Sequence, residues 1–255
     1  MSTLKVRTLA VLVAFGTLAL SAILAAEVRA QTPAVDPAAT QILKRMTDYV
    51  GSLKQFSVHT QNTLEDVLDS GTRIDLDVSA SVLISRPNRL RAERKGDLVS
   101  QVFYYNGKTL TLYNPADKVY ATVAAPGTLE GMLDLARTQL DIVAPASDLI
   151  YRGAYDILMT DVTQGFVVGK GVVEGVRCDH LAFRAPHVDW QIWIQEGKQP
   201  LPRKLVITTR DVANAPQFSI VMTKWNLKPT FTVQTFTFTP PSGANKVEFV
   251  PLAKR

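Results

Sequence analysis

The chain has 255 residues, 20% of them charged and 46% hydrophobic, and a formal net charge of +5. Lys5, Arg7 and Arg29 against Glu27 account for +2 of that charge, which leaves residues 31–255 close to +3. These charges are interspersed along the sequence and form no basic run, which argues against nucleic acid as a partner. The length is sufficient for one domain with a sizeable core.

Residues 1–30 have the three-part layout of a secretory signal peptide. Two basic residues precede an apolar run over 9–26, and Val28 and Ala30 occupy the small-residue positions before a cleavage site. The alternative is an uncleaved anchor, because the run approaches the ~20 residues that span a bilayer. Cys178 is the one cysteine, so we predict neither acylation at the cleavage site nor an internal disulfide. We expect a soluble periplasmic protein whose residues 31–255 form a single domain.

An amphipathic helix is the first element predicted after this leader. Asp36 is a suitable N-cap, and Pro37 suits the first turn of a helix. Apolar residues then recur at helical spacing as far as Leu53. Such a helix needs an apolar surface to cover.

Residues 73–82 alternate between polar and apolar side chains and Ile84 continues the apolar row, which predicts a long antiparallel strand with one apolar and one solvated face. Arg86 follows Ile84 by two residues, so its parity directs it toward the apolar face. A cation there is costly unless it is hydrogen-bonded. Arg86 therefore either holds lid carbonyls or a ligand head group over this face, or turns into water at Pro87.

The sequence after Pro87 predicts more strands with one helical interruption. Asn106-Gly107 joins two short strands and is typical of a type I′ hairpin turn. Residues 126–160 contain two segments with helical spacing, which indicates an inserted helical lid. The expected strands number about eleven and lie at 73–84, 98–105, 108–113, 118–124, 166–168, 172–173, 178–183, 188–194, 204–209, 218–222 and 231–238. This pattern favours an α+β fold whose long antiparallel sheet curls toward a barrel, with the helices covering its concave apolar face.

Motifs for catalysis are missing from the sequence. The three histidines, His59, His180 and His187, lack the spacing of metal ligands. Residues 107–109, Gly-Lys-Thr, lack the upstream glycine and the following helix of a phosphate-binding loop. A G-x-S-x-G nucleophile elbow does not occur either. We therefore predict a protein that is not an enzyme and uses no metal or cofactor, and a hydrolase is the least supported alternative.

Two segments resemble a known family. Residues 85–88, Ser-Arg-Pro-Asn, and 106–115, Asn-Gly-Lys-Thr-Leu-Thr-Leu-Tyr-Asn-Pro, resemble the outer-membrane lipoprotein carriers of the LolA type, and residues 51–61 resemble their helix-to-strand entry. Those carriers have Arg-Pro-Asn at the end of a strand, followed by a D-G-K-T-L-x-x-Y-N-P hairpin. Residues 189–194 and 200–205 resemble a group of predicted periplasmic proteins of unknown function in the same broad superfamily, and this resemblance is closer over the whole chain.

The resemblance implies an unclosed antiparallel half-barrel with helices as a lid over a hydrophobic cavity. In the carriers, the arginine of the motif bonds to the lid, and acyl chains of the cargo displace the lid. Arg86 occupies that position here, so it is the first candidate ligand-site residue. The candidate cavity lining is Leu76, Val78, Val82 and Ile84 on the strand of Arg86, Trp190, Ile192 and Ile194 on a later strand, and Met132 and Leu133 in the lid. Ordinary core packing is the alternative for all of them.

The leading hypothesis is a non-catalytic periplasmic binding or carrier protein for the acyl chains of lipid or lipoprotein cargo. A membrane-bound donor or acceptor protein is the implied partner, and we expect a monomer. The alternative is a structural or regulatory interaction module whose concavity is filled by its own helices, because a fold does not fix a function.

Overall fold

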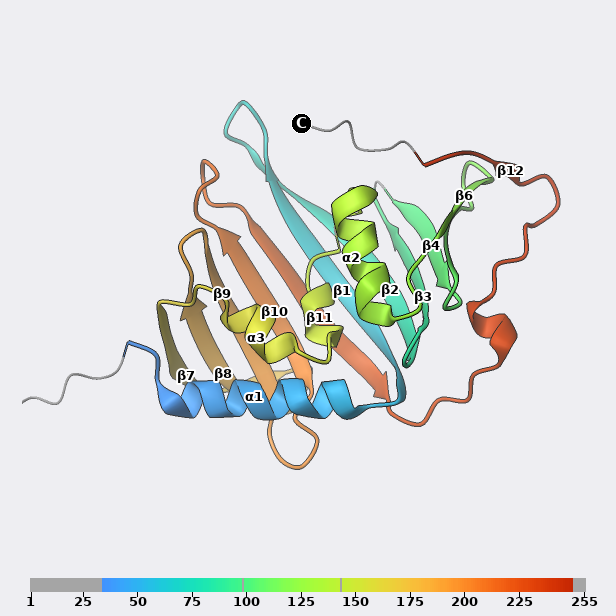
Figure 1. Ribbon diagram of the computed structural model, residues 1–255. Coiled ribbons are helices and arrows are strands. Elements are labelled where there is room, and N and C mark those ends of the chain that lie inside the picture. The colour runs from blue at the N-terminus through green and yellow to red at the C-terminus, as the bar shows by residue number, and fades with distance from the viewer. Residues whose placement is uncertain (1–33, 98, 143, 250–255) are drawn as a thin grey trace, which may run out of the picture. The chain divides into compact units, whose positions relative to one another are not determined.

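The computed structural model describes residues 34–97, 99–142 and 144–249 (Figure 1). The predicted signal peptide, residues 1–30, lies outside them. The helical elements are α1 (Pro37–Ser52), α2 (Leu129–Gln139), the 3-10 helix η1 (Ser147–Ile150), α3 (Ala154–Met159) and the 3-10 helix η2 (Val233–Phe236). The strands are β1 (Gln55–Val67), β2 (Arg73–Ser85), β3 (Arg89–Gly96), β4 (Ser100–Tyr105), β5 (Thr109–Asn114), β6 (Val119–Ala124), β7 (Gln164–Val173), β8 (Val176–Arg184), β9 (Val188–Gln195), β10 (Pro202–Thr209), β11 (Gln217–Asn226) and β12 (Asn245–Lys246).

These strands form one sheet in the order β12-β6-β5-β4-β3-β2-β1-β11-β10-β9-β8-β7. The α+β fold with an unclosed sheet and few helices is therefore confirmed. Its neighbouring strands are antiparallel, with the exception of β12, which pairs with β6 in parallel. The helices α1, α2 and α3 all lie on one face of the sheet (Figure 1), which we call the inner face. The opposite side is the outer face.

The longest strand pair sets the register of the inner face. β1 and β2 are aligned over thirteen residue pairs, from Gln55 opposite Ser85 to Val67 opposite Arg73. Phe56 lies opposite Ile84 on the inner face, and both side chains are fully buried. The alternation of apolar and polar residues in the sequence thus becomes an inner row and an outer row, as expected for a period of two.

α1 closes one end of the inner face. Asp36 caps it by accepting a hydrogen bond from the Ala38 amide at 2.8 Å, as the sequence predicts. Leu43, Met46 and Val50 on its inward side are fully buried. Just before the helix, Val35 forms a parallel bridge with Gly165 of β7, which ties the start of α1 to the edge of the sheet.

The number of predicted strands is nearly right, but the sequence analysis missed three strands and predicted one that does not form. The missed strands are β1 and β3, whose inner rows carry polar residues such as Asn62 and Arg94, and the two-residue strand β12. The two short strands predicted at 166–168 and 172–173 are parts of the single strand β7. The strand predicted at 231–238 does not form, because this segment contains η2 and otherwise lies as coil across the outer face.

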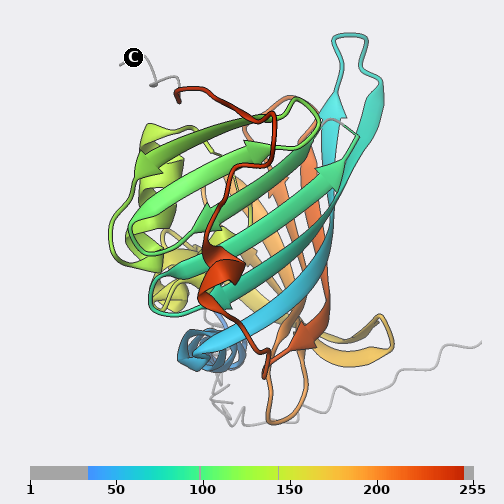
Figure 2. The ribbon, with the colours of Figure 1, turned by 90° about the vertical axis from the view of Figure 1, so that its right-hand side faces the viewer.

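The C-terminal segment crosses the outer face of β3 to β6 (Figure 2). Phe238 of this segment packs among three tyrosines, with its ring centroid 5.4 Å from that of Tyr104, 5.4 Å from that of Tyr113 and 5.0 Å from that of Tyr120. β12 then adds to the outer edge of β6. Among the residues that the structure describes, no helix is both long enough and apolar enough to cross a membrane.

Candidate functional site

Arg86 lies where β2 ends, and its charged side chain is only 2% exposed. Its Nη2 donates a hydrogen bond to the carbonyl oxygen of Ile150 in η1, and its Nη1 donates to Glu130 Oε1 in α2 at 3.3 Å. The side chain therefore joins the end of a sheet strand to two separate helical elements. The alternative in which Arg86 turns into water is wrong, and the expected bond to a lid carbonyl is present.

Burial of Arg86 carries an electrostatic cost. Desolvation lowers the pKa of its guanidinium, and the nearby carboxylate of Glu130 opposes that shift. Its Nε atom is buried without a hydrogen-bond partner among the described residues. A buried cation that is only partly hydrogen-bonded is a poor source of stability. Its two hydrogen bonds join β2 to α2 and η1.

The rest of the Arg-Pro-Asn motif holds the start of the lid, residues 126–160. The Pro87 carbonyl accepts a hydrogen bond from the Leu129 amide at 2.8 Å, at the first residue of α2. Asn88 packs over the β4–β5 turn, where a Cβ on Gly107 would lie 2.6 Å from its side-chain amide. Gly107 also has φ +91, whereas Asn106 does not have positive φ, so the turn is not the type I′ turn predicted.

Tyr105 fixes the chain that leads into α2. Its hydroxyl donates to the carbonyl oxygens of Pro126, at 2.5 Å, and of Thr128, at 3.0 Å. Burial raises the pKa of Tyr105 to about 12, so the hydroxyl stays protonated and remains a donor. Arg86, Pro87 and Tyr105 thus hold the N-terminal end of the lid from two different strands.

α2 is amphipathic and faces the sheet with apolar residues. Leu129 and Met132 are buried, Leu133 is partly buried against the core, and Asp134 and Arg137 are exposed. On the outward side the Tyr151 hydroxyl donates to Asp134 Oδ1 at 2.9 Å, and Arg137 lies 3.4 Å from Asp148 in η1. These contacts hold the lid together as a unit.

The structure separates the predicted lining residues into two groups. The α1 side is the inward row of β8 and β9, and there Trp190, Ile192 and Ile194 are 6%, 0% and 1% exposed. The α2 side is the inward row of β1 to β5. On it Ile84 is fully buried near Arg86, whereas Leu76, Val78 and Val82 are only partly buried.

The partly exposed apolar row of the α2 side continues onto neighbouring strands. Leu64 lies directly opposite Leu76 and is 48% exposed, and Phe218 lies opposite Leu64 with partial exposure. These residues are at the end of β1 and β2 that is remote from Arg86. The inner face is therefore tightly covered at the end where Arg86 bonds to α2 and η1. It carries accessible apolar surface at the opposite end of β1 and β2.

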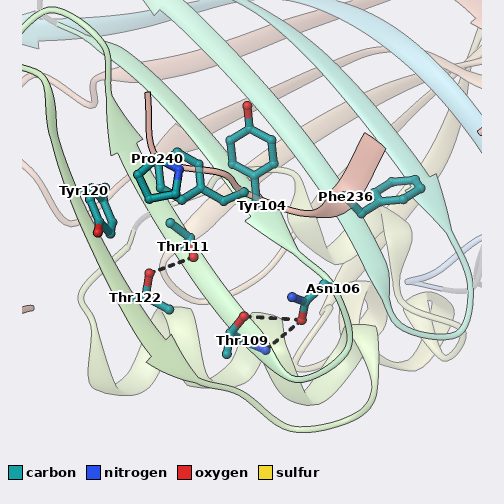
Figure 3. A pocket seen from close by; sticks show the side chains of 9 residues that line it. Tyr104, Asn106, Thr109, Thr111, Tyr120, Thr122, Phe236 and Pro240 are labelled. Carbon is teal, nitrogen blue, oxygen red and sulfur yellow. Dashed lines mark hydrogen bonds between the residues drawn. The ribbon is translucent and has the colours of Figure 1, made fainter. Parts of the chain in front are cut away.

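Two hollows lie on the outer face. One, of about 210 Å³, lies beneath the C-terminal segment between Tyr104, Tyr120 and Pro240 (Figure 3), and the hydroxyls of Thr111 and Thr122 meet in it at 2.9 Å. The other, of about 410 Å³, has polar residues of β1 to β3, such as His59 and Glu93, in its wall. The walls of both hollows mix polar and apolar side chains, and no pattern in the sequence predicts either hollow.

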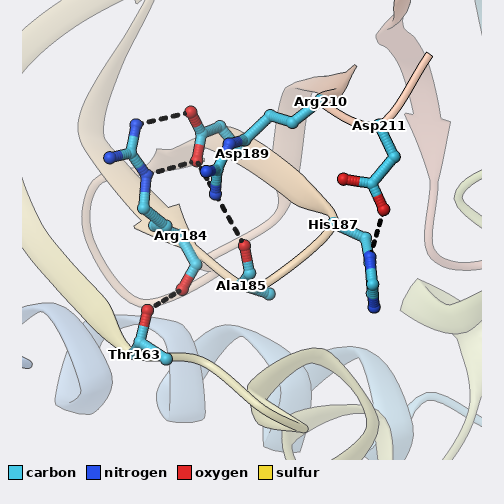
Figure 4. A network of polar contacts seen from close by, with 7 residues as sticks. All are labelled: Thr163, Arg184, Ala185, His187, Asp189, Arg210 and Asp211. Atoms are coloured by element: carbon cyan, nitrogen blue, oxygen red, sulfur yellow. Dashed lines mark hydrogen bonds and ion pairs between the residues drawn. The ribbon is translucent and has the colours of Figure 1, made fainter.

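A polar network lies where β8 ends, β9 begins and β10 ends (Figure 4). Arg184 donates two hydrogen bonds to Asp189, at 2.7 and 2.8 Å, and the neighbouring Arg210 donates to the Ala185 carbonyl at 3.1 Å. His187 pairs with Asp211, and both side chains are more than half exposed. Charges this exposed and this well paired are typical of loop ends, and we assign them no chemistry.

A family model described as "Predicted periplasmic protein (DUF2092)" matches residues 39–250. The match includes the Arg-Pro-Asn motif, the lid and all twelve strands. The chain belongs to this family. A search of curated proteins found no match.

Several solved structures are similar to this member of the family. An uncharacterized conserved protein from Thermus thermophilus has 12% identity and a TM-score of 0.49, with 83% of this chain and 99% of that chain covered. The lipoprotein LppX of Mycobacterium tuberculosis has 16% identity and a TM-score of 0.44, with 77% and 98% covered. A LolA superfamily protein from Nitrosomonas europaea has 10% identity and a TM-score of 0.37, with 78% and 97% covered. The predicted relation to a group of periplasmic proteins of unknown function is confirmed by the family model, and we base no argument on structural similarities this low.

Glu130 and Tyr105 belong to the candidate site but were missed in the sequence. Glu130 lies in the first turn of a helix, where an acidic residue is common for electrostatic reasons alone. Tyr105 belongs to a strand in which its inward direction looks like core packing. A search for charged or hydroxyl-bearing residues at the joints between the sheet and the inserted helices would have found both.

Proposed function

We propose that the protein is a periplasmic, non-catalytic binding or carrier protein for the acyl chains of lipid or lipoprotein cargo. The acyl chain lies between the lid and the α2 side of the sheet, and Arg86 is the latch that holds the lid closed. Residues 1–30 direct export and are removed. A membrane-bound protein serves as donor or acceptor of the cargo, and the carrier acts as a monomer.

The observation that carries this proposal is the buried bond of Arg86 to the lid. A charged side chain that is 2% exposed joins β2 to α2 and η1 through two hydrogen bonds. Packing alone would be served as well or better by an apolar residue of similar volume. A polar latch, in contrast, can be broken and remade without loss of the apolar contacts around it, which suits a lid that opens.

The exposed apolar row supplies a place where a chain can begin to enter. Leu64 and Leu76 form a pair at the end remote from the latch, and Val78 continues the row toward the lid. An acyl chain laid along this row gains by removal of its own surface and that of the protein from water, at about 25 cal/mol per Å². Deeper entry displaces the side chains of Met132 and Leu133 from the sheet.

The proposal is tested by expressing the full chain with residues 1–30 and purifying the protein from the periplasm. Native mass spectrometry followed by organic extraction then detects any bound acyl compound. A mature mass that begins near Gln31 and carries stoichiometric acyl lipid or lipopeptide is the expected result. A bare mature protein that takes up no added lipid contradicts the proposal.

An interaction module is the second candidate, and the packing of the latched end favours it. Ile84, Met132 and Leu149 are at most 3% exposed, so the protein's own lid fills that part of the concavity. In that case the inner face is a permanent core and no ligand enters it. An apolar fluorescent probe separates the two candidates, because a permanent core leaves its emission unchanged.

A further inference from the structure

A second arginine lies on the inner face, on the strand next to Arg86. Arg94 belongs to β3, where it lies opposite Ala80 of β2 and opposite Gln101 of β4. Ala80 and Val82 share the inward row of β2, and Ala92 faces Val82 two residues before Arg94. Arg94 therefore projects from the same face of the sheet as the candidate lining residues of β2.

The surroundings of Arg94 are apolar or neutral. Its guanidinium lies over the ring of Phe103, 5.3 Å from the ring centre, and its Nε donates to Gln101 Oε1 at 2.8 Å. It makes no ion pair with any residue that the structure describes. Desolvation lowers the pKa of Arg94, because the charge is half-buried without a compensating anion.

Two neighbouring arginines, Arg86 and Arg91, each have an acidic partner. Arg86 is paired with Glu130, and Arg91, three residues before Arg94 on the opposite face of the same strand, lies 3.3 Å from Glu93. Arg91 also lies over an aromatic ring, that of Tyr104 at 5.3 Å. Arg91 and Arg94 thus lie on the same strand, and each stacks on an aromatic ring. They differ in that they project from opposite faces of the sheet and in that only Arg91 has a carboxylate partner.

The polar atoms beside Arg94 are donors. Gln101 Oε1 is occupied by the Nε of Arg94, which leaves the side-chain amide of Gln101 and the terminal nitrogens of Arg94 as hydrogen-bond donors. The neighbouring inward positions are small or short, namely Ala80 and, across from it on β1, Thr60. A charged fork with an added amide donor suits a carboxylate or a phosphate.

A further polar atom on this face lacks a partner. Asn62 lies opposite Val78, which in turn lies opposite Gly96 of β3, two residues from Arg94. The Oδ1 atom of Asn62 is buried and has no hydrogen-bond partner among the described residues. As an acceptor, this atom is satisfied by a donor such as a hydroxyl or an amide and not by an oxygen of a carboxylate or phosphate, so Asn62 has no part in binding an anion.

We propose that Arg94 and Gln101 bind the anionic head group, carboxylate or phosphate, of an acyl ligand whose chain lies on the α2 side. This inference rests on the proposed function. It makes the protein selective for anionic lipids over neutral ones, because a neutral head leaves the guanidinium without a counter-charge. The head group sits at the level of Ala80, midway along β2, between the accessible residues Leu76 and Leu64 and the latch.

The test uses probes that share one chain length, namely dodecyl phosphate, dodecanoate and dodecanol. Their affinities are measured by displacement of an apolar fluorescent probe from the full mature protein. We expect both anionic probes to bind the wild type at least about 10-fold more tightly than dodecanol, since hydrogen bonds to charged groups exceed neutral ones by that order. Inorganic phosphate alone is expected to displace nothing, and displacement by it would assign the site to a free anion.

Two variants locate the preference. Arg94→Gln is expected to bind all three chain-matched probes with affinities within about twofold of one another, because the counter-charge is gone. Arg91→Gln is the matched control and is expected to keep the wild-type preference. An Arg94→Gln protein that still prefers the anionic probes overturns the assignment of this residue.

If Arg94→Gln fails to fold, the affinities of the wild type for the three probes still test the head-group site. Equal affinity of the wild type for dodecyl phosphate and dodecanol overturns the head-group site but leaves the acyl-carrier function standing. Absence of binding to every probe refutes the carrier function and the head-group site together. These outcomes are distinguishable in a single set of titrations.

Discussion

The α1 side and the α2 side of the inner face carry similar apolar rows but differ in how they are covered. On the α1 side, Leu181 and Ile192 are fully buried, and α1 packs against β7 and β9. On the α2 side, Leu76 and Val78 remain partly exposed, and Leu64 beside them is 48% exposed. The alternation of residues in a strand reports only that one face is apolar. Whether that face is a core or a binding surface depends on the element that covers it.

The largest expected difference between the two sides is in stability. Ile192→Ala on the α1 side is expected to lower the free energy of unfolding by about 2–5 kcal/mol, because it leaves a cavity in a fully packed region. Leu76→Ala on the α2 side is expected to lower it by about 1 kcal/mol or less, because that side chain is already in contact with water. Denaturant unfolding of both variants measures the difference.

The same two variants are expected to differ in how they affect ligand binding. Leu76→Ala is expected to weaken the binding of an acyl probe while the protein stays folded, whereas Ile192→Ala is expected to act through stability. Equal losses of stability in both variants would mean that the two sides are one continuous core, and the comparison would then be wrong.

The next effect concerns the latch. Arg86→Leu is expected to loosen the lid by about 1.5–3 kcal/mol, because it removes hydrogen bonds from a charged donor to Ile150 and Glu130. Glu130 keeps 30% of its side chain exposed, so the loss stays below that for a fully buried pair. Hydrogen exchange of residues 126–160 measures the loosening, and lipid release is expected to become faster.

Arg89→Leu is the control for the latch. Arg89 lies opposite Ser85, which directs it to the outer face at the same end of the sheet. Its substitution is expected to leave the exchange of the lid unchanged. Binding and release of lipid by Arg86→Leu at wild-type rates would remove Arg86 from the mechanism.

A smaller effect is expected at Tyr105. Tyr105→Phe keeps the buried ring but removes the hydroxyl that donates to Pro126 and Thr128. The expected loss is about 1 kcal/mol, confined to the start of the lid. Faster exchange at residues 126–131 with unchanged exchange in α1 is the supporting result. A uniform change over the whole protein would show that the lid does not open independently.

The smallest effect is a pH dependence on the outer face of the α1 side. His180 stacks on Trp193 with ring centroids 3.9 Å apart, and burial lowers the pKa of the imidazole from its ordinary value of 6.5. The folded state therefore favours neutral His180, so its contribution is full above pH 6.5 and is lost as the pH falls through the lower folded-state pKa. The stability of His180→Gln is expected to vary less with pH between 7.5 and 5 in denaturant titrations.

The sequence predicted the fold class and the inward direction of Arg86 better than it predicted the surroundings of Arg86. The alternation over 73–82 defined β2, and its parity alone directed Arg86 inward. β3 was missed because Arg94 and Gly96 occupy inward positions where the pattern requires apolar residues. That failure is informative, since a strand that breaks its own alternation does so where a charge is placed on an apolar face.

The sequence could not predict which apolar row of the sheet is covered by a helix and which remains partly exposed. Trp190 and Ile192 were placed in the same class as Leu76 and Val78, because a strand pattern contains no information on which helix lies over it. The prediction of a strand at 231–238 was also wrong, because Phe238 packs into a group of three tyrosines on the outer face instead of pairing as part of a strand. The role of both rows as ligand-lining residues stays a prediction.

The most direct test of the account is hydrogen exchange of α1 and α2 in the same molecule, with and without dodecyl phosphate. The account predicts that the amides of residues 129–139 exchange faster than those of residues 37–52 in the free protein, and that only the former change when the ligand binds. Equal protection of both helices, unaffected by the ligand, would contradict a movable lid and make the inner face a closed core.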